Sequence, residues 1–509
     1  MTAFIIANMA PLMFGALVLF LLCGYPVAFA LGANGLLFGL LGMELGLFHV
    51  ELFQALPERV FGIMRNETLL AIPFFTFMGL ILERSGMAED LLDTIGQLFG
   101  PIRGGLAYAV IFVGALLAAT TGVVAASVIS MGLISLPIML RYGYDPRLAT
   151  GVIAASGTLA QIIPPSLVLI IMADQLGRSV GDMYQGAMFP GLVLTAMYAG
   201  FIALTTIFRP SAAPALPLDA RTLRGFKLVQ KVLFSLVPPL VLIFLVLGTI
   251  FIGVATPTEA GAMGAAGALI LAVIRRRLSV DLMKQAMEST AKLSSFVLFI
   301  LIGSTVFGLV FRAVNGDLWV EHLLTGLPGG VLGFLIVVNI LVFVLAFFLD
   351  FFELAFIIVP LLGPVAEKLG IDLIWFGVLL AVNMQTSFMH PPFGFALFFL
   401  RSVAPKDDYD DKVTRRRIKG IKTTDIYWGA IPFVCIQIIM VGLVIAFPSL
   451  VEGGLGSRTK VDVNTIHLEI DAPAYGAPES SDTPSEEGAA EDAPEDPMEA
   501  LKRQLQEQK

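Results

Sequence analysis

Two stretches of this sequence place polar side chains next to a proline pair inside an apolar run. Residues 147–175 carry Ser156, Gly157 and Thr158 before Pro164-Pro165, and residues 371–400 carry Asn383, Gln385, Thr386, Ser387 and His390 before Pro391-Pro392. Proline removes a backbone donor and clashes with the preceding turn, so each pair predicts a broken helix. Unwound main chain in an apolar segment offers carbonyl oxygens to cations and amides to anions, as in transporters.

The two stretches are related by a constant spacing. Pro164 and Pro391 are 227 residues apart (391 minus 164), and the same offset links Pro137 to Pro364. We interpret this as an internal repeat. The alternative is two unrelated proline-kinked helices.

The composition indicates a polytopic membrane protein. Of 509 residues, 57% are hydrophobic and 14% charged, and the mean hydropathy is +0.86, whereas soluble domains carry roughly 25% charged residues. Cys23 and Cys435 lie in apolar runs, and the four histidines lack metal-ligand spacing. We therefore expect an all-α fold in a lipid bilayer, with no nucleic acid partner and no enzyme activity.

Each proline-broken stretch follows an apolar segment of hairpin length. Residues 105–140 would form one straight helix about 54 Å long, against a hydrocarbon core of about 30 Å. We predict a re-entrant hairpin whose tip is Thr120-Thr121-Gly122, because small and hydroxylated residues suit a buried turn. A long tilted helix is the alternative. Residues 331–363 match this segment in length and centre on Asp350.

The halves are separated by a polar linker. We assign 1–208 to the first membrane half, 209–231 to a cytoplasmic linker and 232–448 to the second half. Residues 449–509 form an acidic tail that we predict to be mostly disordered. Residues 49–66, 84–105 and 275–292 are predicted loops.

Positive charge sets the predicted orientation. Five segments (84–105, 141–147, 209–231, 275–292 and 401–424) hold 22 of the 32 Lys and Arg residues. If both hairpins are re-entrant, these segments share the cytoplasmic face, and both termini are periplasmic. The two halves are then inverted copies, the arrangement that produces alternating access.

Several ordered motifs resemble the large membrane subunit of the TRAP (tripartite ATP-independent periplasmic) transporters. They are GTLAQIIPPS (157–166), GAMFPGL (186–192), ATPTEAGA (255–262), FLD (348–350) and HPPFG (390–394). The segment NMQTSFMHPPFGFALFFLR (383–401) resembles the branch of this family that is labelled mannitol/chloroaromatic or 2-oxo acid type.

The resemblance implies a sodium-coupled symporter in the bacterial inner membrane, with an elevator-type transport domain inside a scaffold. Sodium would be a coupling ion and not a prosthetic group. The implied partners are a small four-helix membrane subunit and a periplasmic binding protein that delivers an organic acid.

The resemblance also implies two sodium sites. The first carries over to Thr121 at the hairpin tip and to carbonyls of Ala160, Ile163 and Pro165. The second carries over to Asp350, Ser387, His390 and Phe393. Here the sequence departs from the family, which usually has threonine where His390 stands. Either the His390 main-chain carbonyl serves as the ligand, or Thr386 or Ser387 substitutes, or this site is altered. The His390 side chain is then either a proton-linked group or a packed, hydrogen-bonded one.

Other polar residues have less specific expectations. Thr158, Asn383, Gln385 and Thr386 are candidates for binding the substrate carboxylate. Asp350 either offsets sodium charge or caps a hairpin leg, and Glu259 is expected to be structural because it lies near the end of a span.

Three rival functions remain open from the residues alone. A stand-alone sodium/anion symporter or antiporter of related fold needs no partner subunit. A channel would need a repeated filter or a charged ring, and an intramembrane enzyme would need a nucleophile–base or metal constellation; neither pattern is present in the sequence.

Overall fold

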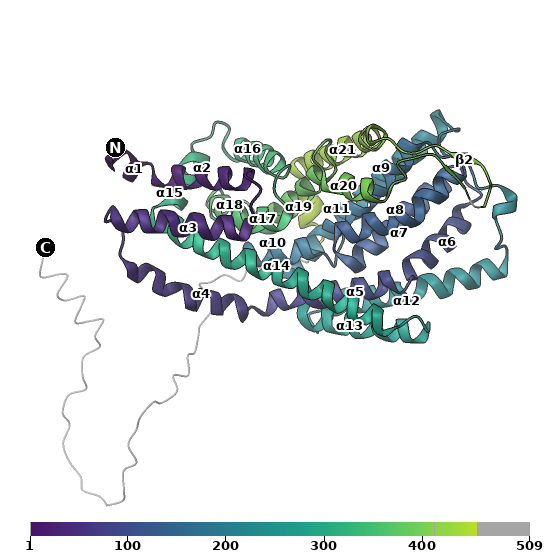
Figure 1. Cartoon of the computed structure of the whole chain (residues 1–509), viewed down its shortest axis with the longest axis horizontal. Helices are drawn as coiled ribbons and strands as arrows, with labels where there is room; N and C mark the ends of the chain where they lie inside the picture. The colour runs from purple at the N-terminus through teal and green to yellow at the C-terminus, as the bar shows by residue number, and fades with distance from the viewer. Residues whose placement is uncertain (1, 412, 456–509) are drawn as a thin grey trace, which may run out of the picture. The chain divides into compact units, whose positions relative to one another are not determined.

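The computed structural model describes residues 2–411 and 413–455, except for the side chains of Thr120 and Thr121. In this part of the protein, apolar runs separated by glycine, proline and polar caps fold into helices. The first half contains α1 (Thr2–Ala7), α2 (Met9–Leu22), α3 (Val27–Glu44), η1 (Val50–Gln54), α4 (Ala55–Met64), α5 (Glu67–Arg84), α6 (Met87–Phe99), α7 (Gly105–Thr121), α8 (Val124–Arg141), α9 (Pro146–Thr158), η2 (Leu159–Gln161), α10 (Leu167–Gln175) and α11 (Val180–Phe208) (Figure 1).

The second half is built in the same way. It contains η3 (Leu218–Ala220), α12 (Phe226–Phe251), α13 (Pro257–Ile274), α14 (Val280–Ala313), α15 (Gly316–Thr325), α16 (Gly330–Leu345), α17 (Phe351–Ile357), α18 (Val359–Lys368), α19 (Leu373–Met389), α20 (Phe395–Val403), α21 (Thr423–Ala446) and α22 (Ser449–Glu452). Two short antiparallel strands, β1 (Tyr409–Asp410) and β2 (Arg417–Ile418), interrupt the helices.

The lengths of the helices fit a membrane protein. Among the described helices, seven are long and apolar enough to cross a bilayer, or nine if each of two bent helix pairs is one span. The predicted all-helical polytopic fold is therefore confirmed.

Several predicted loops are wrong because they fold as helices. Residues 84–105 contain α6, whose Leu91, Leu92 and Ile95 are buried along one side. Residues 49–66 contain η1 and α4, and most of 275–292 belongs to α14. Amphipathic helices carry enough charge to read as loops when only overall polarity is considered.

The predicted hairpin regions contain paired helices. α7 and α8 pack against each other around a turn at Gly122-Val123, so the alternative of one long tilted helix is wrong. In the second region, α16 is followed by a turn and then by α17 and α18, which extend to Lys368.

Helix boundaries repeat with the spacing of the proline pairs. Asp145 caps α9 and Asp372 caps α19, while Val123 precedes α8 and Asp350 precedes α17. Each pair is 227 positions apart, the sequence separation that also divides Thr158 from its hydrogen-bond partner Gln385. Because these two equivalent residues touch, they lie where the two copies meet. The Pro164-Pro165 and Pro391-Pro392 peptide bonds are both cis.

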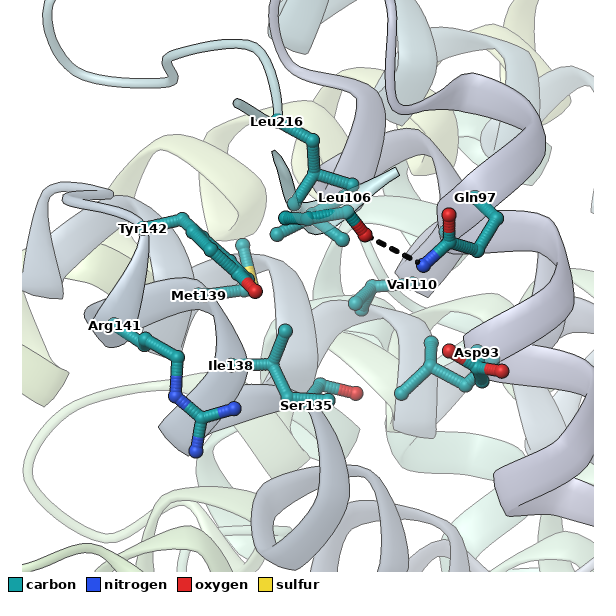
Figure 2. Close-up of a pocket in the computed structure, with 13 residues that line it drawn as sticks. Asp93, Gln97, Leu106, Val110, Ser135, Ile138, Met139, Arg141, Tyr142 and Leu216 are labelled. Carbon is teal, nitrogen blue, oxygen red and sulfur yellow. Dashed lines mark hydrogen bonds between the residues drawn. The ribbon is translucent and has the colours of Figure 1, made fainter. Parts of the chain in front are cut away.

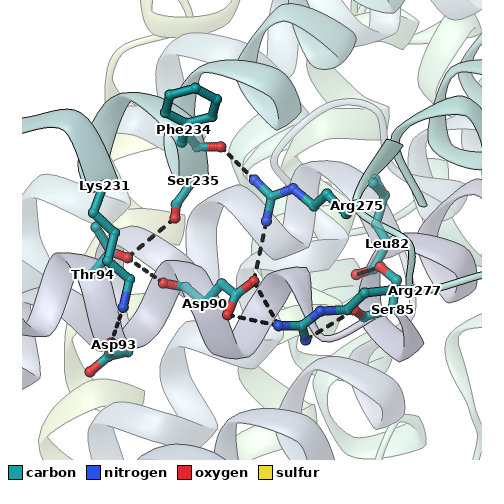
Figure 3. Close-up of polar contacts among 10 residues, drawn as sticks. All are labelled: Leu82, Ser85, Asp90, Asp93, Thr94, Lys231, Phe234, Ser235, Arg275 and Arg277. Carbon is teal, nitrogen blue, oxygen red and sulfur yellow. Dashed lines mark hydrogen bonds and ion pairs between the residues drawn. The ribbon is translucent and has the colours of Figure 1, made fainter. Parts of the chain in front are cut away.

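A polar network joins three of the basic segments at one face (Figure 3). Asp90 on α6 accepts from Arg275 and Arg277, both at 3.3 Å, and Asp93 pairs with Lys231 at 2.7 Å. The Thr94 hydroxyl donates to the Asp90 carbonyl at 2.6 Å and lies 3.3 Å from the Ser235 hydroxyl on α12, within hydrogen-bond distance. Segments 84–105, 209–231 and 275–292 are thereby held side by side.

The remaining two basic segments lie at the same face. Arg141 pairs with Asp411 at 2.9 Å, Arg147 pairs with Asp425 at 3.2 Å, and the Asp145 amide donates to the Ala212 carbonyl at 2.9 Å. All five basic segments therefore share one side of the molecule.

The second hairpin opens toward the other side. Its outer end at Lys368 pairs with Glu321, and neighbouring Glu367 pairs with Arg178, which follows α10. The first broken helix starts at the basic face with α9 and ends near Glu367 with α10. The second starts near Lys368 with α19 and ends at the basic face with α20, where Arg401 donates to the Ile421 carbonyl within the basic segment 401–424. The two broken helices therefore run in opposite directions, and the repeat is inverted.

Asp411 gives the basic face a pH-dependent contact. Burial opposes its ionisation, but hydrogen bonds from the Thr414 amide and hydroxyl and from Arg141 outweigh burial and lower its pKa to about 2. A carboxylate with a lowered pKa stabilises the fold above its ordinary pKa of 3.8, and this contribution is lost as pH falls through about 2.

We expect Asp411→Asn to loosen the segment around β1 and β2 at neutral pH, because the Arg141 guanidinium loses its anionic partner. Tryptic cleavage near Arg415 should accelerate about fivefold or more, as expected for a lost charged hydrogen bond. Asp407→Asn, which changes an exposed carboxylate of the same loop, is the control. Equal cleavage rates in the two variants would show that the Arg141–Asp411 contact does not hold this segment.

Candidate functional site

The first broken helix exposes main-chain oxygens inside the protein. α9 ends at Thr158, η2 continues to Gln161, and residues 162–166 are unwound before α10 begins at Leu167. Within the described residues, no donor reaches the carbonyls of Ala160, Ile163 or Pro165. All three residues are buried. More than about 90% of buried carbonyls are paired, so the unpaired oxygens of this unwound segment form a candidate cation site.

Sequence explains why these oxygens stay free. Pro164 and Pro165 have no N–H groups, so the Ala160 and Gln161 carbonyls one turn earlier lose their helical donors. The Ile163 and Pro165 carbonyls stay free because the extended Ser166 separates them from α10. The Ser166 hydroxyl donates at 2.8 Å to the Gln161 carbonyl, which fixes the turn before α10. The polypeptide therefore holds its open carbonyls in a defined bend.

The tip of the first hairpin lies against this break. Gly122 has φ +59°, and a Cβ there would come within 3.0 Å of Leu167 Cγ and 3.3 Å of the Leu167 amide nitrogen. Only glycine fits a left-handed turn this close to the start of α10. Thr121, the last residue of α7, directly precedes this glycine, although its side chain lies outside the described part of the structure.

The three carbonyls predicted at the second sodium site are less open than those at the first. The Ser387 carbonyl accepts from the His390 amide at 3.2 Å, and the His390 carbonyl accepts from the Gly394 amide at 2.8 Å. Among the carbonyls of Ser387, His390 and Phe393, only that of Phe393 has no donor in the described residues. Ligation through Ser387 or His390 would use the second lone pair of an already bonded carbonyl.

Aromatic rings join the second break to the second hairpin. The His390 ring lies 4.8 Å from Phe347 and 5.3 Å from Phe343, and Phe348 lies 5.7 Å from Phe393. The structure thus brings His390 and Phe393 to the turn before Asp350. His390 is packed among aromatic side chains, and its Nδ1 has no hydrogen-bond partner in the described residues.

Asp350 caps a hairpin leg. Its carboxylate accepts from the Phe351 amide, and the Glu353 carboxylate accepts from the Asp350 amide at 2.9 Å, which completes a capping box. Glu259 forms the same motif with Thr256, whose amide donates to it at 2.8 Å. The geometry favours capping for both acidic residues.

Two of the four candidate substrate residues meet where the repeats join. Gln385 Nε2 donates to Thr158 Oγ1 at 3.3 Å. Asn383 instead donates to the Asn339 carbonyl at 2.7 Å, and Thr386 donates to the carbonyl of Val382 at 3.2 Å. All four side chains are buried, so the structure ties them to protein partners.

Sequence reasoning missed three polar residues around these side chains. Gln437 on α21 donates to Tyr198 Oη at 2.8 Å and to Thr158 Oγ1 at 3.4 Å, and Asn339 supports Asn383. Gln437 is the one amide in the apolar run 429–446, a signal that could have identified it.

We expect Thr158→Val to destabilise the protein, because two buried amides lose the hydroxyl that accepts from them. An unpaired buried donor costs about 1–3 kcal/mol. Thermal unfolding of the detergent-solubilised protein should begin at lower temperature. Thr205→Val, which removes a hydroxyl bonded only to its own helix, should have a smaller effect; equal losses would contradict this role for Thr158.

A separate cavity lies at the outer end of the first hairpin, between α6, α7 and α8 (Figure 2). Its volume is about 130 Å³, and its lining includes Gln97, which donates to the Ala220 carbonyl at 3.0 Å, and Ser135. None of the predicted site residues lines this cavity. It lies at the basic face and not at either break.

Comparison with known proteins identifies the family of this chain. The profile of the family "Tripartite ATP-independent periplasmic transporter, DctM component" matches residues 14–450. The chain is 31% identical over 409 residues to the C4-dicarboxylate TRAP transporter large permease protein DctM of Rhodobacter capsulatus, covering 76% of this chain and 89% of that protein.

Other similar proteins carry different substrate names. The sialic acid TRAP transporter large permease protein SiaM of Vibrio cholerae serotype O1 is 28% identical, with 84% of this chain and 94% of that protein covered. The crystal structure of the Alcanivorax borkumensis YdaH transporter matches with TM-score 0.52 at 15% identity, covering 78% of this chain and 88% of that chain, and supports the fold alone. The chain belongs to the DctM family of TRAP transporter large permeases and is a multi-pass membrane transport protein, not an enzyme.

Proposed function

We propose that this chain couples sodium entry to the import of a small organic acid. The observation that carries the proposal is the group of three buried carbonyls, from Ala160, Ile163 and Pro165, without donors in the described structure. Sodium is a hard cation that is served by oxygen ligands of this kind. Thr121 at the adjoining hairpin tip completes the first proposed site.

The second proposed site uses Phe393, with Ser387 and His390 as further carbonyl donors. Asp350 contributes negative charge near this site while it caps α17. Because two of these carbonyls are already hydrogen-bonded, we expect the second site to bind sodium more weakly than the first.

The inverted repeat supports alternating access by an elevator mechanism. In this proposal the two hairpins and two broken helices form the transport domain, and the other spans form its scaffold. The basic face is cytoplasmic, so both termini lie on the periplasmic side of the bacterial inner membrane.

The proposed substrate class is a carboxylate. Similar permeases are named for C4-dicarboxylates, sialic acid and 2,3-diketo-L-gulonate. The motif NMQTSFMHPPFG favours the 2-oxo acid-like or mannitol/chloroaromatic branch for this chain. Thr158, Asn383, Gln385 and Thr386 would shape the region through which the acid passes.

The proposal includes two protein partners. A small four-helix membrane subunit would brace the scaffold, and a periplasmic binding protein would deliver the acid. Both follow from membership in a tripartite family and are testable in one reconstitution.

We expect uptake of labelled acid into proteoliposomes to require the binding protein, the small subunit and an inward sodium gradient. Replacing sodium with choline is the control for coupling, and omitting the binding protein tests the stand-alone symporter alternative. Full uptake in choline would reject sodium coupling. Full uptake without the binding protein would instead support the stand-alone alternative.

A further inference from the structure

A second cavity lies on the face opposite the basic segments. Its volume is about 230 Å³, and one wall is formed by α4, the start of α5 and α14. The other wall is formed by the end of α10 and by α17 and α18, that is, by elements that follow the first break and belong to the second hairpin. The cavity therefore lies between the proposed transport domain and the scaffold.

Two arginines from the scaffold wall line this cavity without an acidic partner. Arg59 lies on α4 and Arg312 in the last turn of α14, and neither guanidinium forms an ion pair or hydrogen bond with any described residue. By contrast, Arg141 and Arg178 each form an ion pair with a carboxylate from another segment. Arg312 in the last turn is also close to helix carbonyls that favour positive charge.

The single carboxylate in the lining does not neutralise these arginines. Asp174 accepts from Asn66 Nδ2 at 2.6 Å and from Gln175 Nε2 at 2.8 Å. The Asp174 carboxylate is therefore hydrogen-bonded to side-chain amides and not to either arginine. The lining holds two guanidinium groups and one carboxylate, so its net charge is positive. A guanidinium binds a carboxylate through paired donors.

The walls are joined by a small number of polar contacts. Asn66 to Asp174 is one, and the Ser304 hydroxyl donates to the Phe356 carbonyl at 2.6 Å as another. The remaining lining is mainly apolar, with Phe307, Phe311 and Leu361 among its residues. Such a mixture of apolar walls and convergent charged groups is typical of small-molecule sites.

We propose that this cavity receives the substrate carboxylate, with Arg59 and Arg312 as its binding groups. The inference rests on the proposed function and specifies where the acid first meets the permease. The cavity is about the size of a small acid, and its position between the two walls lets a bound anion contact both the scaffold and the elements proposed to move.

The charge of the cavity can be tested without knowing the acid. Thr305 lines the cavity on α14, so Thr305→Cys, in a background where Cys23 and Cys435 are replaced by serine, places one thiol there. We would compare the rates at which an anionic and a cationic methanethiosulfonate of similar size modify this thiol in right-side-out vesicles. We expect the anionic reagent to be favoured about tenfold relative to the same pair on free cysteine.

Variants of the arginines identify the source of this preference. Arg59→Gln with Arg312→Gln should abolish it, while Arg59→Lys with Arg312→Lys should keep it. Arg65→Gln is the matched control, because Arg65 follows α4 but lies over the Phe61 ring, outside the cavity lining. Equal rates for both reagents, or a preference that survives removal of both guanidiniums, would overturn the proposal.

Protection by substrate separates this proposal from the proposed transport function. The acid that the binding protein delivers should slow modification of Thr305→Cys at least about threefold at saturation, and only while Arg59 and Arg312 are intact. An anionic preference without such protection would reject the assignment of the cavity to substrate. Failure of sodium-driven uptake in the unmodified protein would reject the transport proposal, whereas the charge preference of the cavity would remain measurable.

Discussion

Sodium-driven uptake is expected to fall about 100-fold when Pro164 and Pro165 are both replaced with alanine, the equivalent of about 2.7 kcal/mol. Alanine restores two backbone donors and favours helix. The new N–H groups can bond to the Ala160 and Gln161 carbonyls one turn earlier, so the Ala160 oxygen is no longer available to a cation. Uptake should be measured in proteoliposomes with the binding protein and an imposed sodium gradient.

A third proline pair provides a matched control. Pro238 and Pro239 lie inside α12, which is continuous from Phe226 to Phe251. Replacing both with alanine should leave sodium-driven uptake within about twofold of wild type, because no break exists there to repair. Size-exclusion profiles of both double variants should be monodisperse. Equal uptake by the two folded variants would contradict the role of the first break.

Gly429→Leu is expected to prevent accumulation of folded protein. α9 and α21 cross with their backbones in contact: a Cβ on Gly429 would lie 2.1 Å from the Arg147 carbonyl oxygen, and one on Gly151 would lie 2.1 Å from the Gly429 carbonyl oxygen. A backbone oxygen cannot rotate away as a side chain does, so the helices must separate. Overpacking of a core costs about 1–3 kcal/mol or more, and here it also moves the helix that bears the first break.

The control for this variant lies on the same helix. Gly442 belongs to α21, is exposed, and would have no atom within 4 Å of an added Cβ. Gly442→Leu should therefore give a normal yield of monodisperse protein in detergent, whereas Gly429→Leu should give little or none. Comparable yields from both substitutions would show that the α9–α21 crossing tolerates separation.

The comparison of the three proline pairs shows what sequence can and cannot predict. Two pairs interrupt their helices, and the third, Pro238-Pro239, does not. Loss of N–H groups is common to all three, so proline alone does not decide the outcome. Ser166 or Gly394 follows each broken pair within two residues and caps the next helix, whereas the third pair is followed by the apolar run 240–247.

The repeat was predictable because it leaves a constant offset in the sequence. The same offset appears in helix caps such as Asp145 and Asp372. Contacts between other distant residues have no corresponding pattern in the sequence. The ion pair of Arg141 with Asp411 and the meeting of Gln437 with Thr158 depend on packing of segments more than 250 residues apart, since their separations are 270 and 279.

The candidate sodium sites show the same limit. Residue types identified the first break, but only the hydrogen-bond pattern distinguishes the open carbonyls of Ala160, Ile163 and Pro165 from the partly satisfied ones at Ser387 and His390. Likewise, the sequence left Asp350 with two roles, and the capping box with Glu353 favours one of them.

Binding of radioactive sodium to the purified permease complex tests the central claim most directly. We expect saturable binding at both breaks in the wild-type protein. The tighter component should be lost from the Pro164→Ala, Pro165→Ala double variant and retained when Pro238 and Pro239 are replaced. Identical saturable sodium binding by all three proteins, or none in the wild type, would contradict the assignment of the coupling ion to the open carbonyls of the first broken helix.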